Sequence, residues 1–413
     1  MVLATRFQHA TGQRDGCGTW RDTKMRIACV HQGYELYGSD RSFAESVAAL
    51  RAAFPSADIE VVLPRSGPIV QILEGHASRI VFEPLWVLRR QAILRLATVE
   101  MARLPMAVLR AWRRLRDCDL TYINTSIVAD YALAARFVPG KAVLHIHEIP
   151  EGAMRRVLVG LMRWSHADLI FNSRATRAAF GDPRGSRTHV VYNGVAGPAA
   201  AEAMTYDGKR PLRVLLLGRV NRIKGQEVLL EAIASMPPEL RSRIEVRLVG
   251  GAFESAERER ALAELVESMG LAERVSVLPF VPDPSEHYRW ADIVTVPSRR
   301  PESLGRVAIE AMAHGRPPLV SAIGGLVEVV IDGKTGWHVP PGDAAALAGK
   351  LREIILRPDA WRGFVAAGRS RYEEIFSEQV AAAAIAAIAT DKLRSALAKP
   401  GRAHAAREAE TSS

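Results

Sequence analysis

Cysteine is scarce in this sequence, and two features of secreted or membrane proteins are missing. The 413 residues include three cysteines, Cys17, Cys29 and Cys118, an odd number at wide spacing. This predicts a reducing compartment and no disulfide framework. No apolar run approaches the length of a bilayer span, so no transmembrane helix is expected. Residues 1–24 lack the apolar core of a signal peptide and are predicted to be a disordered leader, so we expect a cytoplasmic protein.

Motifs for a metal or an organic cofactor are also missing. No segment resembles an Asp-x-Asp metal motif, and nothing marks a lysine that would carry pyridoxal phosphate. We therefore expect no cofactor and no metal site.

Positive charge is in excess but unevenly distributed. The formal net charge is +10; residues 1–195 hold 26 Lys and Arg against 17 Asp and Glu, whereas residues 196–413 hold 29 against 28. Residues 86–116 contain eight arginines and one glutamate. Such a basic, amphipathic segment suits an anionic surface at the inner face of a membrane, but it also suits a solvated arginine face over buried leucines. Nucleic acid is disfavoured, because the basic residues lack interleaved stacking aromatics.

Short apolar strands alternate with amphipathic helices along most of the chain. Strands in the first half are expected at 25–31, 58–64, 120–125, 141–147, 167–173 and 187–193. Strands in the second half are expected at 212–218, 244–250, 274–280, 291–298, 317–321 and 336–340. The small, polar stretch 196–211 between them is predicted to be a linker. The pattern predicts an α/β protein with two Rossmann-like, doubly wound domains, 25–195 and 212–370, facing a central cleft.

The C-terminal residues depart from the alternation of strands and helices. A long apolar helix is expected at about 371–398 and must pack against another part of the molecule. Residues 399–413 are predicted to be a disordered tail.

Ligands of doubly wound sheets lie beyond the carboxyl ends of the strands, so the loops that follow strands are the candidate sites. Arg219 and Lys224 follow the first strand of the second half, close to Gly218 and Gly225. Glycines let backbone amides approach an anion at a helix start, and two cations beside them would hold a diphosphate without a metal. An ordinary charged surface loop is the alternative.

A second candidate is the stretch "PESLGRVAIEAM" at 301–312. We expect a helix whose first turn holds Ser303, Leu304 and Gly305, with free amides for phosphate or sugar oxygens. Glu302 and Glu310 are eight residues apart, which is about 12 Å of helical rise. They would accept hydrogen bonds from a sugar and from a ribose diol. Taken singly, each glutamate also suits an ordinary helix-end charge or surface ion pair.

The motifs together resemble the retaining family 4 glycosyltransferases of GT-B fold, over about residues 25–398. The matching pieces, in order, are "YGSDRSF", "HIHE", "FNSRATR", "YNGV", "LGRVNRIKGQ", "LVGG", "ADIVTVPS", "PESLGRVAIEAM" and "AIGGLVEVVIDGKTGWHV". The resemblance implies that helix 371–398 crosses back onto the N-terminal domain. It also implies that a nucleotide-sugar donor binds mainly the C-terminal domain and the acceptor mainly the N-terminal one.

The resemblance also implies roles for single residues. Arg219 and Lys224 match diphosphate ligands, Glu302 the glutamate that holds the transferred hexose and Glu310 the glutamate that holds the ribose. Two N-terminal residues match family positions that face the distal phosphate and the reacting sugar, Gly38 and His147 respectively. Leu304 and Arg306 depart from the usual residues, which puts the identity of the sugar in doubt.

Three further residues stay open. His31 follows the first strand, where inverting GT-B enzymes carry a catalytic base, but the resemblance favours a structural histidine. His147 suits a sugar contact and a buried, hydrogen-bonded histidine about equally, and His145 is expected to point to the other face of its strand. Glu328 lies in a loop near the same pocket, with no role assigned.

The resemblance implies retaining, metal-independent transfer of a hexosyl unit from a nucleoside-diphosphate sugar to a polysaccharide or lipid-linked glycan acceptor. Glu302, His147, Arg219 and Lys224 are the candidate catalytic residues. The alternatives are a sugar-nucleotide epimerase or phosphorylase on the same scaffold, or a non-catalytic basic module that binds nucleic acid or a membrane.

Overall fold

The computed structural model describes residues 12–14, 20–22, 24–36, 38–88, 99–183, 185–201, 206–252 and 255–397. The tail expected at 399–413 and residues 89–98 of the basic segment lie outside this set. Within the expected leader, β1 (Gly12–Arg14) and β2 (Trp20–Asp22) pair antiparallel, so this part has regular structure where disorder was predicted.

The first half of the chain forms a seven-stranded parallel sheet in the order β5-β4-β3-β6-β7-β8-β9. Six of its strands were expected from the apolar runs, while the short, half-buried edge strand β5 was missed. The strands are β3 (Arg26–His31), β4 (Asp58–Leu63), β5 (Arg79–Phe82), β6 (Leu120–Asn124), β7 (Ala142–Ile146), β8 (Asp168–Phe171) and β9 (Thr188–Val190).

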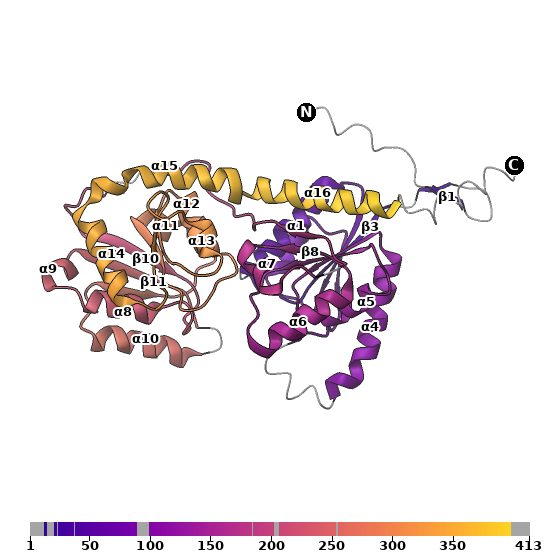
Figure 1. Cartoon of the computed structure of the whole chain (residues 1–413), viewed down its shortest axis with the longest axis horizontal. Helices are drawn as coiled ribbons and strands as arrows, with labels where there is room; N and C mark the ends of the chain where they lie inside the picture. Colours follow the sequence, from indigo (N-terminus) through magenta and orange to yellow (C-terminus); the bar gives the residue numbers. More distant parts are fainter. Residues whose placement is uncertain are drawn as a thin grey trace.

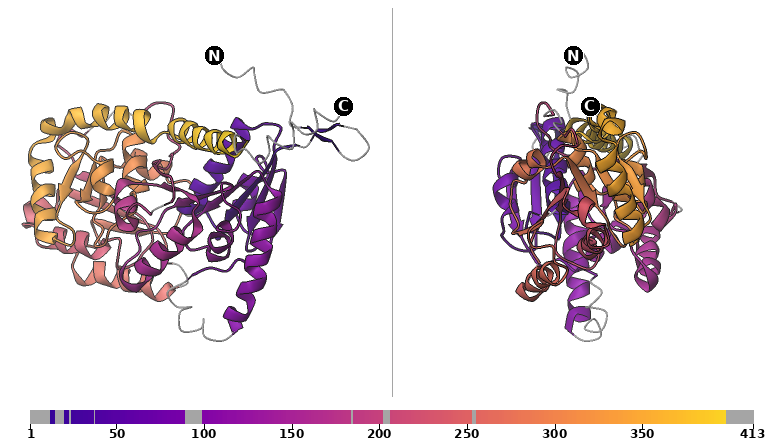
Figure 2. Two further views of the ribbon diagram at one scale, coloured as in Figure 1. Left: turned by 45° about the vertical axis from the view of Figure 1, so that its right-hand side comes forward. Right: turned by 90° about the vertical axis from the view of Figure 1, so that its left-hand side faces the viewer.

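Helices cover both faces of this sheet, because the strands are apolar on both sides. On one face α1 (Gly38–Ala53) and α2 (Ile69–Leu73) pack with the C-terminal helix α16 (Glu378–Leu397). The other face carries α4 (Val99–Asp117), α5 (Ala129–Ala135), α6 (Gly152–Ser165) and α7 (Arg174–Phe180). The first turns of α4 project beyond the rest of this half (Figure 2).

The second half forms a six-stranded parallel sheet in the order β12-β11-β10-β13-β14-β15. All six strands match those expected from the sequence. The strands are β10 (Leu212–Leu217), β11 (Ile244–Val249), β12 (Val275–Leu278), β13 (Ile293–Val296), β14 (Pro318–Ser321) and β15 (Trp337–Val339). The helices are α8 (Gln226–Ala234), α9 (Pro238–Arg241), α10 (Ala256–Ser268), α11 (Ser285–Trp290), α12 (Arg306–Ala313), α13 (Leu326–Val329) and α14 (Ala344–Leu356).

The chain returns from the second half to the first along one edge of the molecule (Figure 1). A 3₁₀ turn (Pro358–Trp361) leads into α15 (Arg362–Arg371), a π-helical turn (Tyr372–Phe376) and then α16. The helix expected from residue 371 is therefore interrupted, and α16 begins only at Glu378. The reason is local: Ser377 is extended, and Val195 donates its backbone N–H to the Phe376 carbonyl at 2.9 Å.

The two sheets, with helices on both faces, confirm the predicted GT-B architecture of two Rossmann-like units. In each sheet the strand order reverses once, between β3 and β6 and between β10 and β13. Ligands of such sheets bind beyond the carboxyl ends of the strands at these reversals. Among the described residues, none of the helices combines the length and the apolar character needed to span a bilayer.

Candidate active site

The reversal point of the second sheet is formed by the loops that follow β10 and β13. The β10 loop requires glycine at two places. Gly218 has φ 155°, and Gly225, the residue before α8, has φ 77°. A Cβ on Gly225 would lie 2.0 Å from the Pro297 carbonyl oxygen of the β13 loop. The glycines therefore bring the two loops into direct backbone contact.

This contact places Lys224 beside Glu302. The Lys224 Nζ lies 2.8 Å from Oε1 of Glu302, which also accepts a hydrogen bond from the Ser298 hydroxyl. The two side chains are 24% and 13% exposed, so the pair is shielded but reachable from the cleft. Arg219 is exposed on the same loop, and its carbonyl accepts a hydrogen bond from Gln226 at 3.0 Å. The structure therefore gathers three predicted site residues at one edge.

The helix after β13 begins later than expected. α12 starts at Arg306, and Gly305 precedes it with φ 96°, a left-handed conformation. Ser303, Leu304 and Gly305 are thus loop residues rather than the first helical turn, and Leu304 is buried in the core. The reason is steric: Gly305 packs so closely on Leu326 that a Cβ would lie 2.3 Å from its side chain. The helical-rise spacing of Glu302 and Glu310 therefore does not apply.

Glu310 lies inside α12 with both carboxylate oxygens engaged. Oε2 accepts a hydrogen bond from the Tyr288 hydroxyl at 2.6 Å, and Oε1 accepts one from Nε of Arg306 at 3.0 Å. Tyr288 stacks on His314, with ring centroids 4.8 Å apart. Burial, reinforced by the Glu310 carboxylate, raises the pKa of Tyr288, so the phenol stays protonated as a donor.

Arg306 links the two halves of the molecule. Its Nη2 lies 2.8 Å from Oε1 of Glu45 on α1, while its Nε holds Glu310. Gly38 is next to this bridge, because a Cβ there would lie 3.8 Å from the Arg306 Cδ. Burial raises the pKa of Glu45, against the lowering effect of Arg306. Arg306, one of the two departures from the usual family residues, therefore joins the first-loop region to the helix that carries Glu310.

At the reversal point of the first sheet, polar side chains form a hydrogen-bond chain. His31 is buried; its Nε2 lies 2.8 Å from Asp40 Oδ1, and its Nδ1 lies 3.0 Å from the Asn124 amide nitrogen. The Asn124 amide oxygen lies 2.7 Å from Nε2 of His147. Both ring nitrogens of His31 are thus engaged within the protein, which fits a structural histidine better than a base.

His145 does not point away from His147 as expected. Their rings lie on the same side of β7, with centroids 4.1 Å apart, because residues two apart in a strand share a face. Burial lowers the pKa of His145 to about 3, and burial together with the neighbouring histidines lowers the pKa of His147. Both imidazoles are therefore neutral near pH 7. Nδ1 of His147 is buried without a hydrogen-bond partner among the described residues.

Glu328 and Ser303 make further contacts between the halves. The Glu328 carboxylate accepts hydrogen bonds from the backbone N–H groups of Arg174 and Ala175, at 2.8 and 2.6 Å, at the start of α7. The Ser303 hydroxyl oxygen accepts one from the Asn172 amide at 3.2 Å. Glu328 thus neutralises the positive end of a helix from the opposite half.

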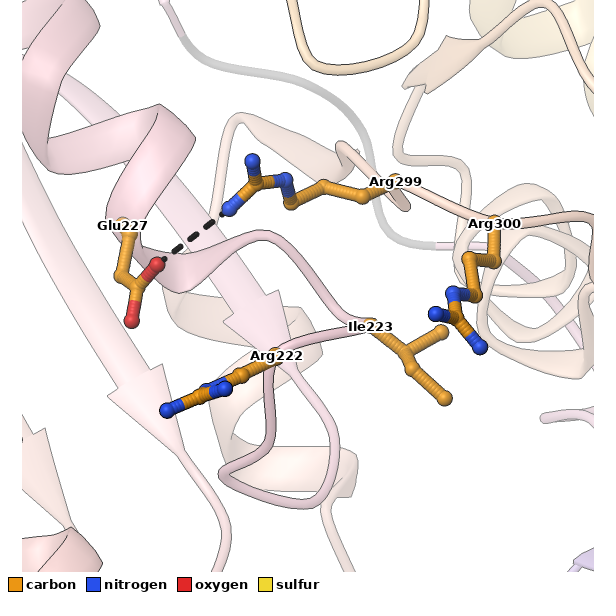
Figure 3. Close-up of a pocket in the computed structure, with 5 residues that line it drawn as sticks. All are labelled: Arg222, Ile223, Glu227, Arg299 and Arg300. Carbon is orange, nitrogen blue, oxygen red and sulfur yellow. Dashed lines mark hydrogen bonds and ion pairs between the residues drawn. The ribbon is translucent and has the colours of Figure 1, made fainter.

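An open, cationic pocket of about 730 Å³ adjoins these loops (Figure 3). Arg222, Arg299 and Arg300 line it, together with Ile223 and Glu227. Arg299 pairs with Glu227 at 3.4 Å, as the dashed line in Figure 3 marks. Three guanidinium groups against one lining carboxylate make this pocket positive, which suits an anionic group.

Sequence reasoning missed several partners of the site residues. Asn124 is the last residue of β6 and Ser298 lies two residues after β13, so both are at the carboxyl ends of strands, where the other candidates were sought. Asp40, Glu45 and Tyr288 carry no such signal, because they join the site through packing between elements. Among the described residues, no group of three or more His, Cys, Asp or Glu side chains is placed to hold a metal.

Comparison with known proteins gives a family for the second half. Residues 207–371 match the family model for glycosyl transferases group 1. The D-inositol 3-phosphate glycosyltransferase of Geodermatophilus obscurus is 38% identical over 170 residues, which is 40% of this chain and 37% of that protein. The protein of the same name from a Nocardioides species is 40% identical over 176 residues, 40% of this chain and 38% of its own. The matches thus span about two fifths of these relatives.

Solved structures extend the likeness to both halves. HepE of Anabaena, crystallised with UDP-glucose, superimposes with a TM-score of 0.71 over 89% of this chain and all of its own, at 24% identity. WaaG, a glycosyltransferase of lipopolysaccharide biosynthesis, gives a TM-score of 0.60 over 87% of this chain and 98% of its own, at 16% identity. These likenesses establish the fold. The family match applies to residues 207–371 of the second half, which resemble the glycosyl transferases group 1, while the likeness over both halves is one of GT-B fold.

Proposed function

We propose that the chain is a retaining glycosyltransferase that moves a hexosyl unit from a nucleoside-diphosphate sugar to a polysaccharide or lipid-linked glycan. The family match of residues 207–371 and the loops at the second reversal point support this proposal. The D-inositol 3-phosphate glycosyltransferases and WaaG act on different acceptors by name, so the acceptor class rests on the surface features of this chain.

The donor diphosphate lies against Arg219 and Lys224 in this proposal. Glu302 binds hexose hydroxyls and Glu310 binds the ribose diol, with Gly38, Ser303, Leu304 and Gly305 supplying backbone contacts. The observation that carries the proposal is the Lys224–Glu302 pair, 2.8 Å apart. It holds a cation and a hydrogen-bond acceptor side by side, as a phosphate adjoining a sugar requires.

The mechanism follows from charge development. Departure of the nucleoside diphosphate builds negative charge on a phosphate oxygen, and the fixed cations of Arg219 and Lys224 stabilise it without reorganisation. The departing phosphate accepts the proton of the attacking hydroxyl on the same face, which retains the configuration. His147 orients a sugar hydroxyl, because its neutral, unpartnered Nδ1 can accept a hydrogen bond.

The first test is direct. The full-length protein is screened by thermal shift against UDP-, GDP-, ADP- and TDP-linked hexoses, and NMR then assigns the anomeric configuration of the product. A donor at one hundred times its dissociation constant should stabilise the protein by about 2.7 kcal/mol. Inversion at the anomeric carbon would contradict the proposal and return His31 to consideration as a base.

Metal independence has its own test. The cations proposed to neutralise the diphosphate are side chains, so activity should persist in excess EDTA. Loss of activity on chelation, restored by Mg²⁺ or Mn²⁺, would overturn this part alone. An epimerase on the same scaffold is tested by incubation with donor alone, because only an epimerase interconverts the sugars without an acceptor.

Helix α4 supports a lipid-linked acceptor at an anionic membrane surface. Met101, Met106 and Leu109 are exposed on it, at 49%, 65% and 38%. Arg110 and other arginines flank them, which is the pattern of an interfacial helix. Co-sedimentation with anionic liposomes at low salt is the test, and failure to pellet would contradict it.

A further inference from the structure

A second cavity, separate from the loops described above, lies between α1 and α16 beside the crossing between the halves. Its volume is about 400 Å³. Ala49 and Ala52 of α1 face Ala382 and Ile385 of α16 across it, so its walls are apolar. His145 of β7 also lines it.

The protonation of His145 follows from a chain of hydrogen bonds. The Ser46 hydroxyl donates to the Ser42 carbonyl at 2.8 Å, and the Tyr122 hydroxyl donates to the Ser46 oxygen at 2.9 Å. Tyr122 has one proton, so its contact with His145 Nδ1 requires that Nδ1 carries the hydrogen. A neutral imidazole carries one N–H, so Nε2 is an acceptor.

This acceptor is unsatisfied. Nε2 of His145 is buried and has no hydrogen-bond partner among the described residues, and the same holds for Oδ1 of Asn193, which lines the same cavity. Buried acceptors without partners are costly, at about 1–3 kcal/mol each, so they mark a place where a donor binds.

The charge of the cavity is negative. Glu45 and Glu378 line it at the end near the crossing. Arg306 is the cation in contact with Glu45, and the same guanidinium also pairs with Glu310. The side chain of Arg306 is therefore shared between Glu45 and Glu310, and Glu378 adds a further carboxylate to the lining.

We propose that this cavity binds a small protonated alkylamine of the diamine or polyamine class. The ammonium group donates to His145 Nε2 and Asn193 Oδ1 beside Glu45, and the methylene chain lies between the alanines of α1 and α16. A neutral polyol would satisfy the same acceptors but not the charge. The bound amine joins α1 to α16 and to the crossing between the halves, outside the proposed donor site.

The experiment is a calorimetric titration of the full-length protein with putrescine, with 1,4-butanediol as the neutral isostere. Ala382→Leu fills the cavity from α16, and Ala383→Leu makes the same change at the next, exposed position of the helix. Putrescine should bind wild type and Ala383→Leu with equal affinity, and Ala382→Leu at least about tenfold more weakly. Butanediol should not bind measurably.

Two measurements keep the proposal falsifiable if Ala382→Leu folds poorly. Glu378→Gln changes only an exposed side chain and should weaken putrescine binding several-fold. In histidine-labelled protein, the ¹⁵N resonance of His145 Nε2 should shift on addition of putrescine from its unprotonated position. Absence of saturable binding, or equal binding of butanediol, would show a water-filled cavity and overturn the proposal; neither result bears on glycosyl transfer.

Discussion

The two halves share one topology but differ in the chemistry of their facing edges. The first half carries almost all the net charge, yet its edge joins His31, Asn124 and His147 in a chain of hydrogen bonds within the protein. The second half is nearly neutral in total, yet its edge presents Lys224 and the arginines around it. Net charge therefore does not locate the site, because a few fixed side chains at strand ends decide the local potential.

The difference suggests a division of labour. In the proposed function, the second half would stabilise developing negative charge, whereas the first would orient uncharged hydroxyls through neutral acceptors. Arg306 joins the two edges through Glu45 and Glu310. Variants on each side should therefore change different observables.

The largest effect is expected at Lys224. Lys224→Met removes a preorganised cation and should lower kcat/KM by about 10²- to 10³-fold. Lys350→Met removes a lysine of similar exposure, 27% against 24%, that is paired within α14; it is the matched control and should be neutral. A loss at Lys224 no greater than at Lys350 would break the proposed role of the second half.

The second-largest effect, a loss of stability, is expected at Arg306. Arg306→Met leaves Glu45 and Glu310 without their shared cation, and removing one partner of a buried pair costs about 3 kcal/mol or more in the free energy of unfolding. The side chains of Arg306 and Glu45 are 17% and 21% exposed, whereas those of Arg299 and Glu227 are 50% and 48% exposed.

Arg299→Met is therefore the control, with an expected change below about 1 kcal/mol in urea unfolding. Adding Glu45→Ala to Arg306→Met should recover part of the loss, because it removes an unpaired carboxylate. Additive losses would mean that the two residues do not act as a pair.

The pH dependence of stability tests the neutral edge. The pKa of His145 is about 3 in the folded protein against 6.5 ordinarily, so below pH 6.5 the unfolded chain binds a proton that the folded protein does not. The contribution of His145 to the free energy of unfolding is then complete above about pH 6.5. Below that pH, the free energy of unfolding should fall by about 1.4 kcal/mol per pH unit. His145→Gln should show a shallower slope; an unchanged slope would mean that His145 titrates normally.

His147 should give a smaller effect, confined to turnover. His147→Ala removes one neutral hydrogen bond to a sugar hydroxyl, worth about 1 kcal/mol, so kcat should fall about fivefold. The affinity for the free nucleoside diphosphate, measured calorimetrically, should not change. A loss of nucleotide affinity would contradict the division between the two edges.

The smallest effect on the folded enzyme is expected on α4. Met106→Glu changes a side chain that is 65% exposed and should alter stability by no more than about 0.5 kcal/mol. Activity on a water-soluble acceptor should also persist, while binding to anionic liposomes should weaken. Unchanged pelleting would remove α4 from the proposed membrane contact.

Much of the fold was predictable because its signals are local. Twelve of the thirteen strands in the two parallel sheets read as short apolar runs, and half-buried β5 was the one missed there. The start of α12 was misplaced, because Gly305 is left-handed and packs against Leu326 at the start of α13. The break before α16 arises in the same way, from a backbone contact with Val195.

The sequence by itself determined the two-sheet architecture, the family resemblance and the loops that follow the strands. These depend on hydrophobic periodicity, which is a local property of the sequence. Only the tertiary structure decided that Arg306 bridges Glu45 and Glu310, that His145 and His147 share a face, and that a cavity lies under α16. Those outcomes depend on the distance between residues far apart in the chain, which packing of the two halves sets and no local pattern records.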